Sequence, residues 1–166
     1  MLEIQRLNST EGERWRSIRL AALHDAPDAF GTTLADADAF PPELWSRQVG
    51  EFPTFIAVLD GVDVGDVGVV RATPDIEQPE AAFLLSMWVA PDARGKGVGD
   101  QLIDAVASWA EADGFSRLVL DVADANASAI ALYARKGFEP TGDIGTLPSP
   151  RQHIREHRRA LALPRA

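Results

Sequence analysis

The feature that most constrains this chain is an apolar run that ends in a glycine-rich turn. Residues 83–89 read Phe-Leu-Leu-Ser-Met-Trp-Val, and Pro91 follows the run. A run of this length before a proline predicts a strand that is buried on both faces. Residues 94–99 then read Arg-Gly-Lys-Gly-Val-Gly and lead into a segment with helical periodicity. Because glycines let backbone N–H groups approach a ligand and a helix N-terminus favours negative charge, the unit predicts a site for a phosphorylated cofactor.

The charge of the chain limits the partners that such a site can serve. The sequence has 16 Lys and Arg against 25 Asp and Glu, which gives a net charge of −9. This balance argues against a nucleic-acid partner, because binding to nucleic acid needs an extended basic face. It also makes Arg94 and Lys96 informative, since both cations stand beside the glycines. The acidic remainder favours a cationic partner such as an amine, although many acidic surfaces serve only solubility.

Several other classes of site are disfavoured by the composition. The chain has no cysteine, which excludes disulfides, thiolate metal ligands and a cysteine nucleophile. His153 and His157 stand four residues apart in a predicted loop and strand, so they do not converge on one metal ion, and we expect no metal. Residues 1–7 alternate like a strand and not like a signal peptide, and the apolar runs are too short to cross a bilayer. We therefore expect a cytoplasmic protein that does not contact a membrane.

The length and the order of patterns predict one α/β domain over residues 1–166. Alternating or continuous apolar runs predict strands, and helical periodicity behind capping signals predicts helices. The predicted strands cover residues 2–7, 55–59, 62–71, 83–89, 117–122, a segment from 138, and 156–163. The predicted helices follow a capping box at 10–13, the prolines at 41–42, Gly99 and Asn126, with connections at 30–33, 73–79 and 142–150. This order predicts a sheet that is mixed and not purely parallel.

Two common nucleotide-binding motifs do not fit the glycine turn. A dinucleotide-binding fold needs Gly-x-Gly-x-x-Gly after the first strand and an acidic residue at the end of the next strand. Asp121 is suitably placed for that acidic residue, but Asp100 stands where the third glycine belongs, and the unit comes in mid-chain. A P-loop needs Gly-Lys followed by Ser or Thr, and the turn does not end in that sequence.

Two separate segments resemble motifs of one protein family. Residues 89–99 match the pattern Arg/Gln-x-x-Gly-x-Gly after a strand and a proline, and they resemble the acetyl-CoA-binding motif of the GCN5-related N-acetyltransferase (GNAT) superfamily. Residues 120–138 are similar to the Asn, Ala, Leu-Tyr and Lys-Gly-Phe pattern of the same family through Asn126 and Tyr133. The matching segments span residues 83–141, and the predicted order of elements fits the family over the whole chain.

The resemblance implies a fold and a reaction. The implied GNAT fold is a central mixed, mostly antiparallel sheet of about six to seven strands with a splayed parallel pair, flanked by about four helices. The implied reaction is the direct transfer of an acetyl group from acetyl-CoA to an amine, either a small amine or a protein or peptide amino group. The alternative is a non-catalytic acyl-CoA-binding regulatory module. The acceptor and the oligomeric state stay open, although homodimers are common in the family.

The resemblance also implies which residues bind the cofactor. The pantetheine arm is expected between the strands at 83–89 and 117–122, where it pairs with strand backbone as an added strand does. Backbone N–H groups of the glycine turn are expected to hold the pyrophosphate at the helix N-terminus. Asn126 is expected either to touch the cofactor or to cap its helix. The full set of expected cofactor-binding residues is Met87, Trp88, Val89, Arg94, Gly95, Lys96, Gly97, Val98, Gly99, Asp100 and Asn126.

The expected proton donor is Tyr133, the only tyrosine of the chain. In the family pattern this hydroxyl protonates the departing thiolate, and a phenol of pKa about 10 can share a proton with a thiol of pKa about 8.5. The other interpretation of Tyr133 is an aromatic ring that packs a helix onto the sheet.

The expected base is Asp121, which stands where some relatives carry a glutamate for this purpose. An amine must be neutral to attack, and its conjugate ammonium has a pKa of about 10. A group that takes up the ammonium proton is therefore required at neutral pH. Glu80, Asp75, Glu77 and a chain of waters are the alternatives to Asp121. The family resemblance places the acceptor against residues 23–50 and 142–155, of which the first segment is acidic.

Overall fold

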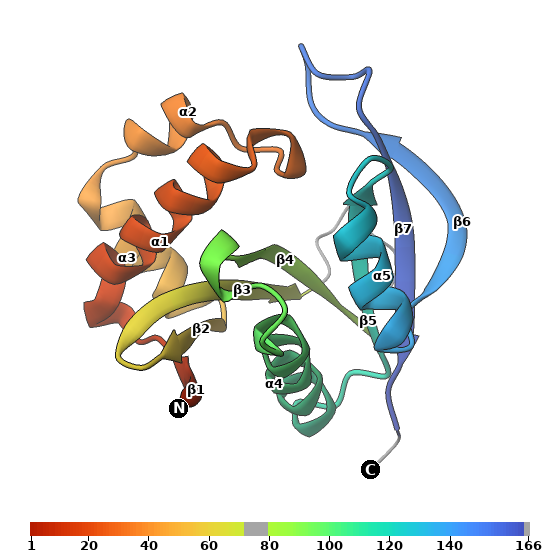
Figure 1. The fold of residues 1–166 in the computed structure, drawn as a ribbon, viewed down its shortest axis with the longest axis horizontal. Coiled ribbons are helices and arrows are strands. Elements are labelled where there is room, and N and C mark those ends of the chain that lie inside the picture. Colours follow the sequence, from red (N-terminus) through yellow and green to blue (C-terminus); the bar gives the residue numbers. More distant parts are fainter. Residues whose placement is uncertain (72–79, 165–166) are drawn as a thin grey trace.

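The computed structural model describes residues 1–71 and 80–164 (Figure 1), and within them seven strands form one sheet in the order β1-β2-β3-β4-β5-β7-β6. The neighbours β4 and β5 are parallel, and the other neighbouring pairs are antiparallel. This arrangement confirms the predicted mixed sheet with one parallel pair. The strands are β1 (Leu2–Arg6), β2 (Thr54–Leu59), β3 (Val62–Arg71), β4 (Ala81–Val89), β5 (Arg117–Ala123), β6 (Glu139–Thr146) and β7 (Arg155–Ala162).

The helices cover the sheet from both sides (Figure 1). They are α1 (Gly12–Asp25), α2 (Leu34–Asp38), α3 (Pro42–Glu51), α4 (Val98–Ala112) and α5 (Ala127–Arg135), with short 3-10 turns η1 (Ser9–Glu11), η2 (Pro27–Ala29) and η3 (Pro91–Ala93). One core packs α1 and α3 against β2 and β4, and includes Trp15, Trp45 and Trp88. The other packs α4 and α5 against the opposite face, and includes Leu120 and Tyr133.

The start of the first helix differs from the predicted capping box at 10–13. The capping box is formed by Asn8 and Glu11, whose side chains bond the backbone N–H groups of Thr10 (2.9 Å) and Asn8 (3.2 Å) respectively. Asparagine is among the best N-cap residues, so the chain enters a 3-10 turn first and α1 begins at Gly12.

Two further elements were not predicted in full. The short helix α2 starts beyond the connection at 30–33, where the Thr33 hydroxyl accepts from the backbone N–H of Asp36 at 3.1 Å. Strand β6 runs from Glu139 to Thr146, so residues 142–146 of the loop predicted at 142–150 are strand. All eight residues of β6 are exposed, and a register shift interrupts its pairing with β7. A strand without a buried face carries no alternating apolar pattern, which is why the sequence predicted the start of this strand near residue 138 but not its length.

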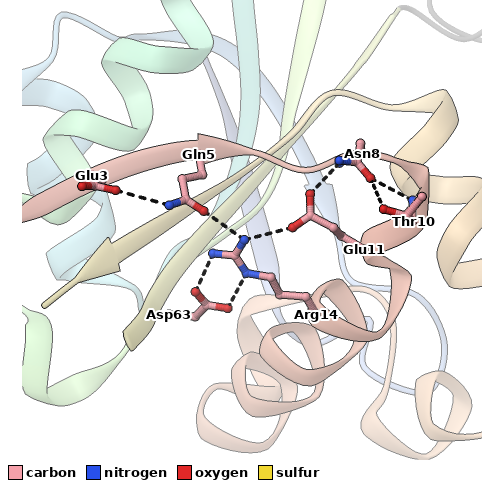
Figure 2. A network of polar contacts seen from close by, with 7 residues as sticks. All are labelled: Glu3, Gln5, Asn8, Thr10, Glu11, Arg14 and Asp63. Atoms are coloured by element: carbon pink, nitrogen blue, oxygen red, sulfur yellow. Dashed lines mark hydrogen bonds and ion pairs between the residues drawn. The ribbon is translucent and has the colours of Figure 1, made fainter. Parts of the chain in front are cut away.

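A polar network fastens the first strand and helix to the sheet (Figure 2). Arg14 of α1 donates to both carboxylate oxygens of Asp63 in β3, at 2.8 and 2.7 Å, and also to Gln5 of β1 and Glu11, each at 3.0 Å. These contacts raise the pKa of Arg14, chiefly through the hydrogen bond to Asp63. The network lines a shallow hollow at this edge, but its members satisfy one another, so we assign it a structural role.

Two ionisable side chains, Asp66 and Arg19, are buried on the α1 side of the sheet. Asp66 of β3 is fully buried, and neither carboxylate oxygen has a hydrogen-bond partner among the described residues. Arg19 of α1 is also buried, with its guanidinium 4.4 Å from the ring centroid of Phe30 and its Nη1 without a partner in the same set. Burial raises the pKa of Asp66 to about 8, and the charge of Arg19 opposes that rise. Asp66 is therefore mostly protonated in the folded protein at neutral pH.

The raised pKa of Asp66 predicts a folding stability that falls as pH rises from about 4 to about 8. Over this range the unfolded chain has lost the aspartate proton while the folded chain retains it, which costs up to about 5 kcal/mol of unfolding free energy. We expect Asp66→Asn to flatten this slope in denaturant titrations repeated between pH 4.5 and 8. Asp92→Asn, at an exposed turn carboxylate, is the control and should retain the wild-type slope. An unchanged slope in Asp66→Asn would contradict the assigned proton.

Candidate active site

The parallel strands β4 and β5 separate soon after they begin. Their backbone ladder joins Ala81 to Arg117 and continues to Phe83 and Val119, where the described pairing ends. Beyond that point β4 carries Ser86 at φ 60°, an unusual value for a non-glycine residue, and its register with β3 shifts near the same place. A bulge of this kind bends a strand away from its neighbour. The result is a cavity of about 1060 Å³ that is lined by both strands.

The cavity brings together nearly all of the residues predicted from the sequence. They are contributed by the end of β4, the glycine turn, the start of α4, β5 and α5. Lys96 is the predicted residue that is absent from the described lining. The predicted residues that line it are Met87, Trp88, Val89, Arg94, Gly95, Gly97, Val98, Gly99, Asp100, Asp121, Asn126 and Tyr133.

The glycine turn is open where a phosphate would lie. Gly95 and Gly97 have φ values of 77° and 78°, and a Cβ added at either would meet nothing within 4 Å. Gly97 is the N-cap of α4 and provides no side-chain cap, so the first N–H groups of the helix face the cavity without a capping side chain. Gly99 serves another purpose, because a Cβ there would lie 2.8 Å from Leu132 of α5. The first two glycines thus suit a ligand, and the third suits helix packing.

Arg94 is held by protein groups. Its Nη2 donates to Asp25 at 2.7 Å and its Nε donates to the Val89 carbonyl at 3.0 Å. Asp25, the last residue of α1, also accepts a hydrogen bond from the Trp88 indole at 3.0 Å. The Trp88 bond, followed by Arg94, lowers the pKa of Asp25. Arg94 therefore joins the end of α1 to the end of β4, and much of its charge is balanced by Asp25.

Arg135 is a second cation beside the glycine turn, and the sequence analysis did not include it among the cofactor-binding residues. Arg135 of α5 lines the cavity and donates to Asp100 of α4, with its Nη2 3.0 and 3.2 Å from the two carboxylate oxygens. This contact lowers the pKa of Asp100 and offsets a negative charge at the site proposed for phosphate. Lys136 and Asp104 form a further ion pair between the same helices at 2.6 Å. The two positions lie 35 residues apart, so no local pattern relates Arg135 to Asp100.

Tyr133 combines a buried ring with access to the cavity. Its ring packs edge-on against Phe138, with centroids 5.7 Å apart, and it belongs to the α4–α5 core. The side chain is 5% exposed, and burial raises its pKa above the ordinary value. Asn126 caps α5, accepting from the Ala129 N–H at 3.3 Å, and also lines the cavity. Tyr133 is thus a neutral phenol at physiological pH and suits the role of a proton donor.

Asp121 is engaged by a neighbouring cation. Arg158 of β7 lies opposite it in the register and donates to both carboxylate oxygens, at 2.9 and 3.1 Å. The same guanidinium lies 5.3 Å from the ring centroid of Phe83. Of the alternative bases, Glu80 is exposed and is absent from the described lining, while Asp75 and Glu77 lie outside the described residues. Of the predicted bases that the structure describes, Asp121 is thus paired with an arginine and Glu80 lies outside the cavity lining.

The two segments predicted to surround the acceptor meet at one end of the cavity. Arg151, in the turn before β7, donates to the Pro27 carbonyl at 2.6 Å and the Gly31 carbonyl at 2.9 Å. The 3-10 turn η2 and Ile154 from the other segment line the same space. Glu156 of β7 also lines it, although no sequence motif distinguished this residue.

The described residues contain no group of three or more His, Cys, Asp or Glu arranged for a metal ion. His157, one of the two histidines weighed from the sequence, pairs with Asp124 at 2.6 Å. No helix in the described part of the chain is long and apolar enough to cross a membrane.

Comparison with known proteins identifies relatives over most of the chain. The profile of the acetyltransferase (GNAT) family matches residues 15–138. The chain is 29% identical over 143 residues to aminoglycoside N(6′)-acetyltransferase type 1 of Salmonella enteritidis, covering 84% of this chain and 93% of that protein. It is 30% identical over 142 residues to the L-methionine sulfoximine/L-methionine sulfone acetyltransferase of Pseudomonas paraeruginosa, with coverages of 77% and 83%. Its fold matches the structure of yncA from Salmonella typhimurium with its cofactor acetyl-CoA, at a TM-score of 0.77 and 20% identity over 100% and 96% of the two chains.

Proposed function

The chain belongs to the acetyltransferase (GNAT) family, and we propose that it transfers the acetyl group of acetyl-CoA directly to a cationic amine. The family match confirms the resemblance predicted from the sequence. The observation that carries the proposal for this chain is the cavity between β4 and β5. It joins an open glycine turn, a buried phenol and an acidic pocket in one continuous space.

The residues around the cavity suit acetyl-CoA as the acyl donor. The N–H groups at Gly95 and Gly97 and the uncapped start of α4 fit a pyrophosphate, and Arg135 adds a cation beside them. The backbone at the end of β4, freed from pairing with β5, can pair with the pantetheine amides as an added strand does. When bound, the thioester supplies an activated acetyl group, and an N–H near Val89 would stabilise charge on its oxygen.

Tyr133 is the proposed proton donor to the sulfur of CoA. Burial raises the pKa of Tyr133 and keeps the phenol neutral, and Tyr133 lines the same cavity as both strands. A neutral phenol there can give its proton to the thiolate as that charge develops. A non-catalytic acyl-CoA-binding module would need the glycine turn but would not need this phenol. The catalytic function is therefore the one that accounts for both features.

The proposed acceptor is a cationic amine. The relatives named above acetylate aminoglycosides, L-methionine sulfoximine and L-methionine sulfone. In this chain the cavity is lined by Asp28, Asp121 and Glu156. Asp28 and Asp121 are paired with arginines, so Glu156 is the carboxylate of the three that is left to attract an ammonium group. We further propose a homodimer, a state common in the family, and a cytoplasmic location, as the residue pattern at the N-terminus predicts.

The direct test measures free thiol released from acetyl-CoA in the presence of an amine panel. The panel comprises an aminoglycoside with a 6′-amine, L-methionine sulfone, a peptide with N-terminal alanine, and 1,3-diaminopropane. We expect turnover with at least one of these amines above the rate of thioester hydrolysis in the protein's absence. CoA binding by calorimetry without any turnover would instead support the non-catalytic module.

A further inference from the structure

Glu156 is a carboxylate of the cavity lining that came from no sequence motif. It lies in β7 directly opposite Ala123 of β5, beside the pair that Asp121 makes with Arg158. Residues directly opposite on neighbouring strands share a face of the sheet, so Glu156 lies on the face of Ala123. Asp121 is two residues before Ala123 in β5 and therefore lies on that face as well. Both line the cavity, at the end closed by η2 and the turn before β7.

Glu156 and Asp121 differ in their hydrogen bonding. Both oxygens of Asp121 receive hydrogen bonds from Arg158. The Glu156 side chain forms no ion pair or hydrogen bond with another of the residues that the structure describes, although it is half-buried. Burial, followed by the negative charge of Asp121, raises the pKa of Glu156. An unpaired carboxylate with a raised pKa retains its lone pairs for a ligand and is better matched to taking a proton from an amine.

The position of Glu156 relative to Tyr133 is suited to a transfer between two substrates. Leu120 and Val122 of β5 belong to the α4–α5 core with Tyr133. Side chains alternate along a strand, so Asp121, and with it Glu156, faces the opposite side of the sheet. The cavity connects the two sides through the gap between β4 and β5. An amine can therefore meet Glu156 on one side of the gap while the sulfur meets Tyr133 on the other.

We propose that Glu156, and not Asp121, receives the ammonium group of the acceptor and accepts its proton. This inference rests on the proposed acetyltransferase function and assigns the step that the sequence left open. Asp121, held by Arg158, acts as a positioning residue that fixes the charge beside the acceptor.

The proposed step balances in atoms and charge. One proton of the ammonium passes to the Glu156 carboxylate, and the neutral nitrogen forms a bond to the acetyl carbon as the carbon–sulfur bond breaks. The CoA thiolate takes a proton from Tyr133, and the second proton lost by the nitrogen restores that phenol. Glu156 then returns its proton to solvent, so one proton is released for each amide formed.

The charged environment of Glu156 determines the pH dependence. The charged and titratable groups that line the cavity around it are Arg19, Asp25, Asp28, Arg94, Asp100, Asp121, Tyr133 and Arg135, and Arg158 adjoins it on β7. The four aspartates of this set are each paired with an arginine. Glu156 is therefore the group whose ionisation we expect to govern the acid side of the kcat/KM profile.

The test compares Glu156→Gln, Asp121→Asn and Glu139→Gln with the wild type, using the panel amine that turns over fastest. Glu139 is an exposed glutamate of β6 and controls for the isosteric change. We expect Glu156→Gln to lower kcat/KM for the amine on the order of 100-fold, with CoA affinity and unfolding midpoint retained. The acid limb of its pH–rate profile should disappear. Asp121→Asn should lose less and retain that limb, and Glu139→Gln should match the wild type.

Two different results would separate this inference from the proposed function. Wild-type turnover together with an unchanged kcat/KM in Glu156→Gln, or a larger loss in Asp121→Asn, would overturn the role of Glu156 alone. No turnover of any panel amine by the wild type would overturn the proposed function and this inference with it.

Discussion

Replacing Tyr133 with phenylalanine is expected to lower kcat by a factor on the order of 10² to 10³, the range typical for loss of a general acid. The phenol is the buried donor at the cavity, and without it the CoA thiolate must leave unprotonated or wait for water. The ring itself remains, so its edge-on contact with Phe138 should be kept. We expect the affinity for CoA to change less than twofold and the unfolding free energy by less than about 1 kcal/mol.

Steady-state thiol release and calorimetry with CoA separate the two roles of Tyr133. A loss confined to kcat supports the proton donor. A collapse of CoA affinity with kcat retained would show that the hydroxyl serves binding, and an unchanged kcat would leave Tyr133 as a packing residue. Phe138→Leu is a useful companion, because it disturbs the same aromatic contact without removing a proton.

Placing glutamate at Gly97 is expected to weaken CoA binding on the order of 100-fold or more. Gly97 has a φ of 78°, and the space around its α-carbon is open toward the proposed pyrophosphate site. A carboxylate there would occupy that space and oppose a diphosphate at short range, where two like charges about 4 Å apart interact by about 4 kcal/mol at an effective dielectric constant of about 20. Calorimetric titration with CoA measures the effect directly.

The matched control for Gly97→Glu is Gly114→Glu, at the opposite end of α4. Gly114 has a φ of 89°, and a Cβ added there would likewise meet nothing within 4 Å. Both variants should therefore lose about 1–2 kcal/mol of stability from the left-handed backbone, and only Gly97→Glu should lose CoA affinity. Equal affinities in the two variants would contradict a phosphate site at the glycine turn.

The parts of the fold that could be predicted are those that local chemistry specifies. The apolar runs predict the strands β4 and β5, and the glycines at 95 and 97 predict the turn between strand and helix. The expected burial of residues 83–89 on both faces was wrong for the second half of the run, where Leu85 is exposed and the strand borders the cavity. The Asn126 cap and the glycine after residue 136 mark both ends of α5. These signals lie within a few residues of the structure that they produce, and the family resemblance then supplied the splayed pair.

The remaining features depend on contacts between distant parts of the chain. Arg94 meets Asp25 across 69 residues, and Arg158 meets Asp121 across 37. No local spacing indicates that Arg94, predicted to bind the cofactor, or Asp121, predicted as the base, will form an ion pair with another side chain. Glu156 was not predicted as a site residue for a related reason. Its place beside Asp121 follows from the register of β7 against β5 and not from its own neighbours in sequence.

The separation of β4 and β5 also gives this protein two strand edges in its interior. Elsewhere, an unpaired edge invites another polypeptide to add a strand, and proteins protect such edges from aggregation. Here the unpaired edges border a cavity that α5 and η2 also line, so a molecule with amides of its own can pair with them. When such a molecule binds, the backbone groups along the gap replace hydrogen bonds to water with hydrogen bonds to the ligand, which then lies between β4 and β5 as an additional strand would. Occupancy should consequently add to the cooperativity of the whole domain, because both halves of the sheet would then share one ladder.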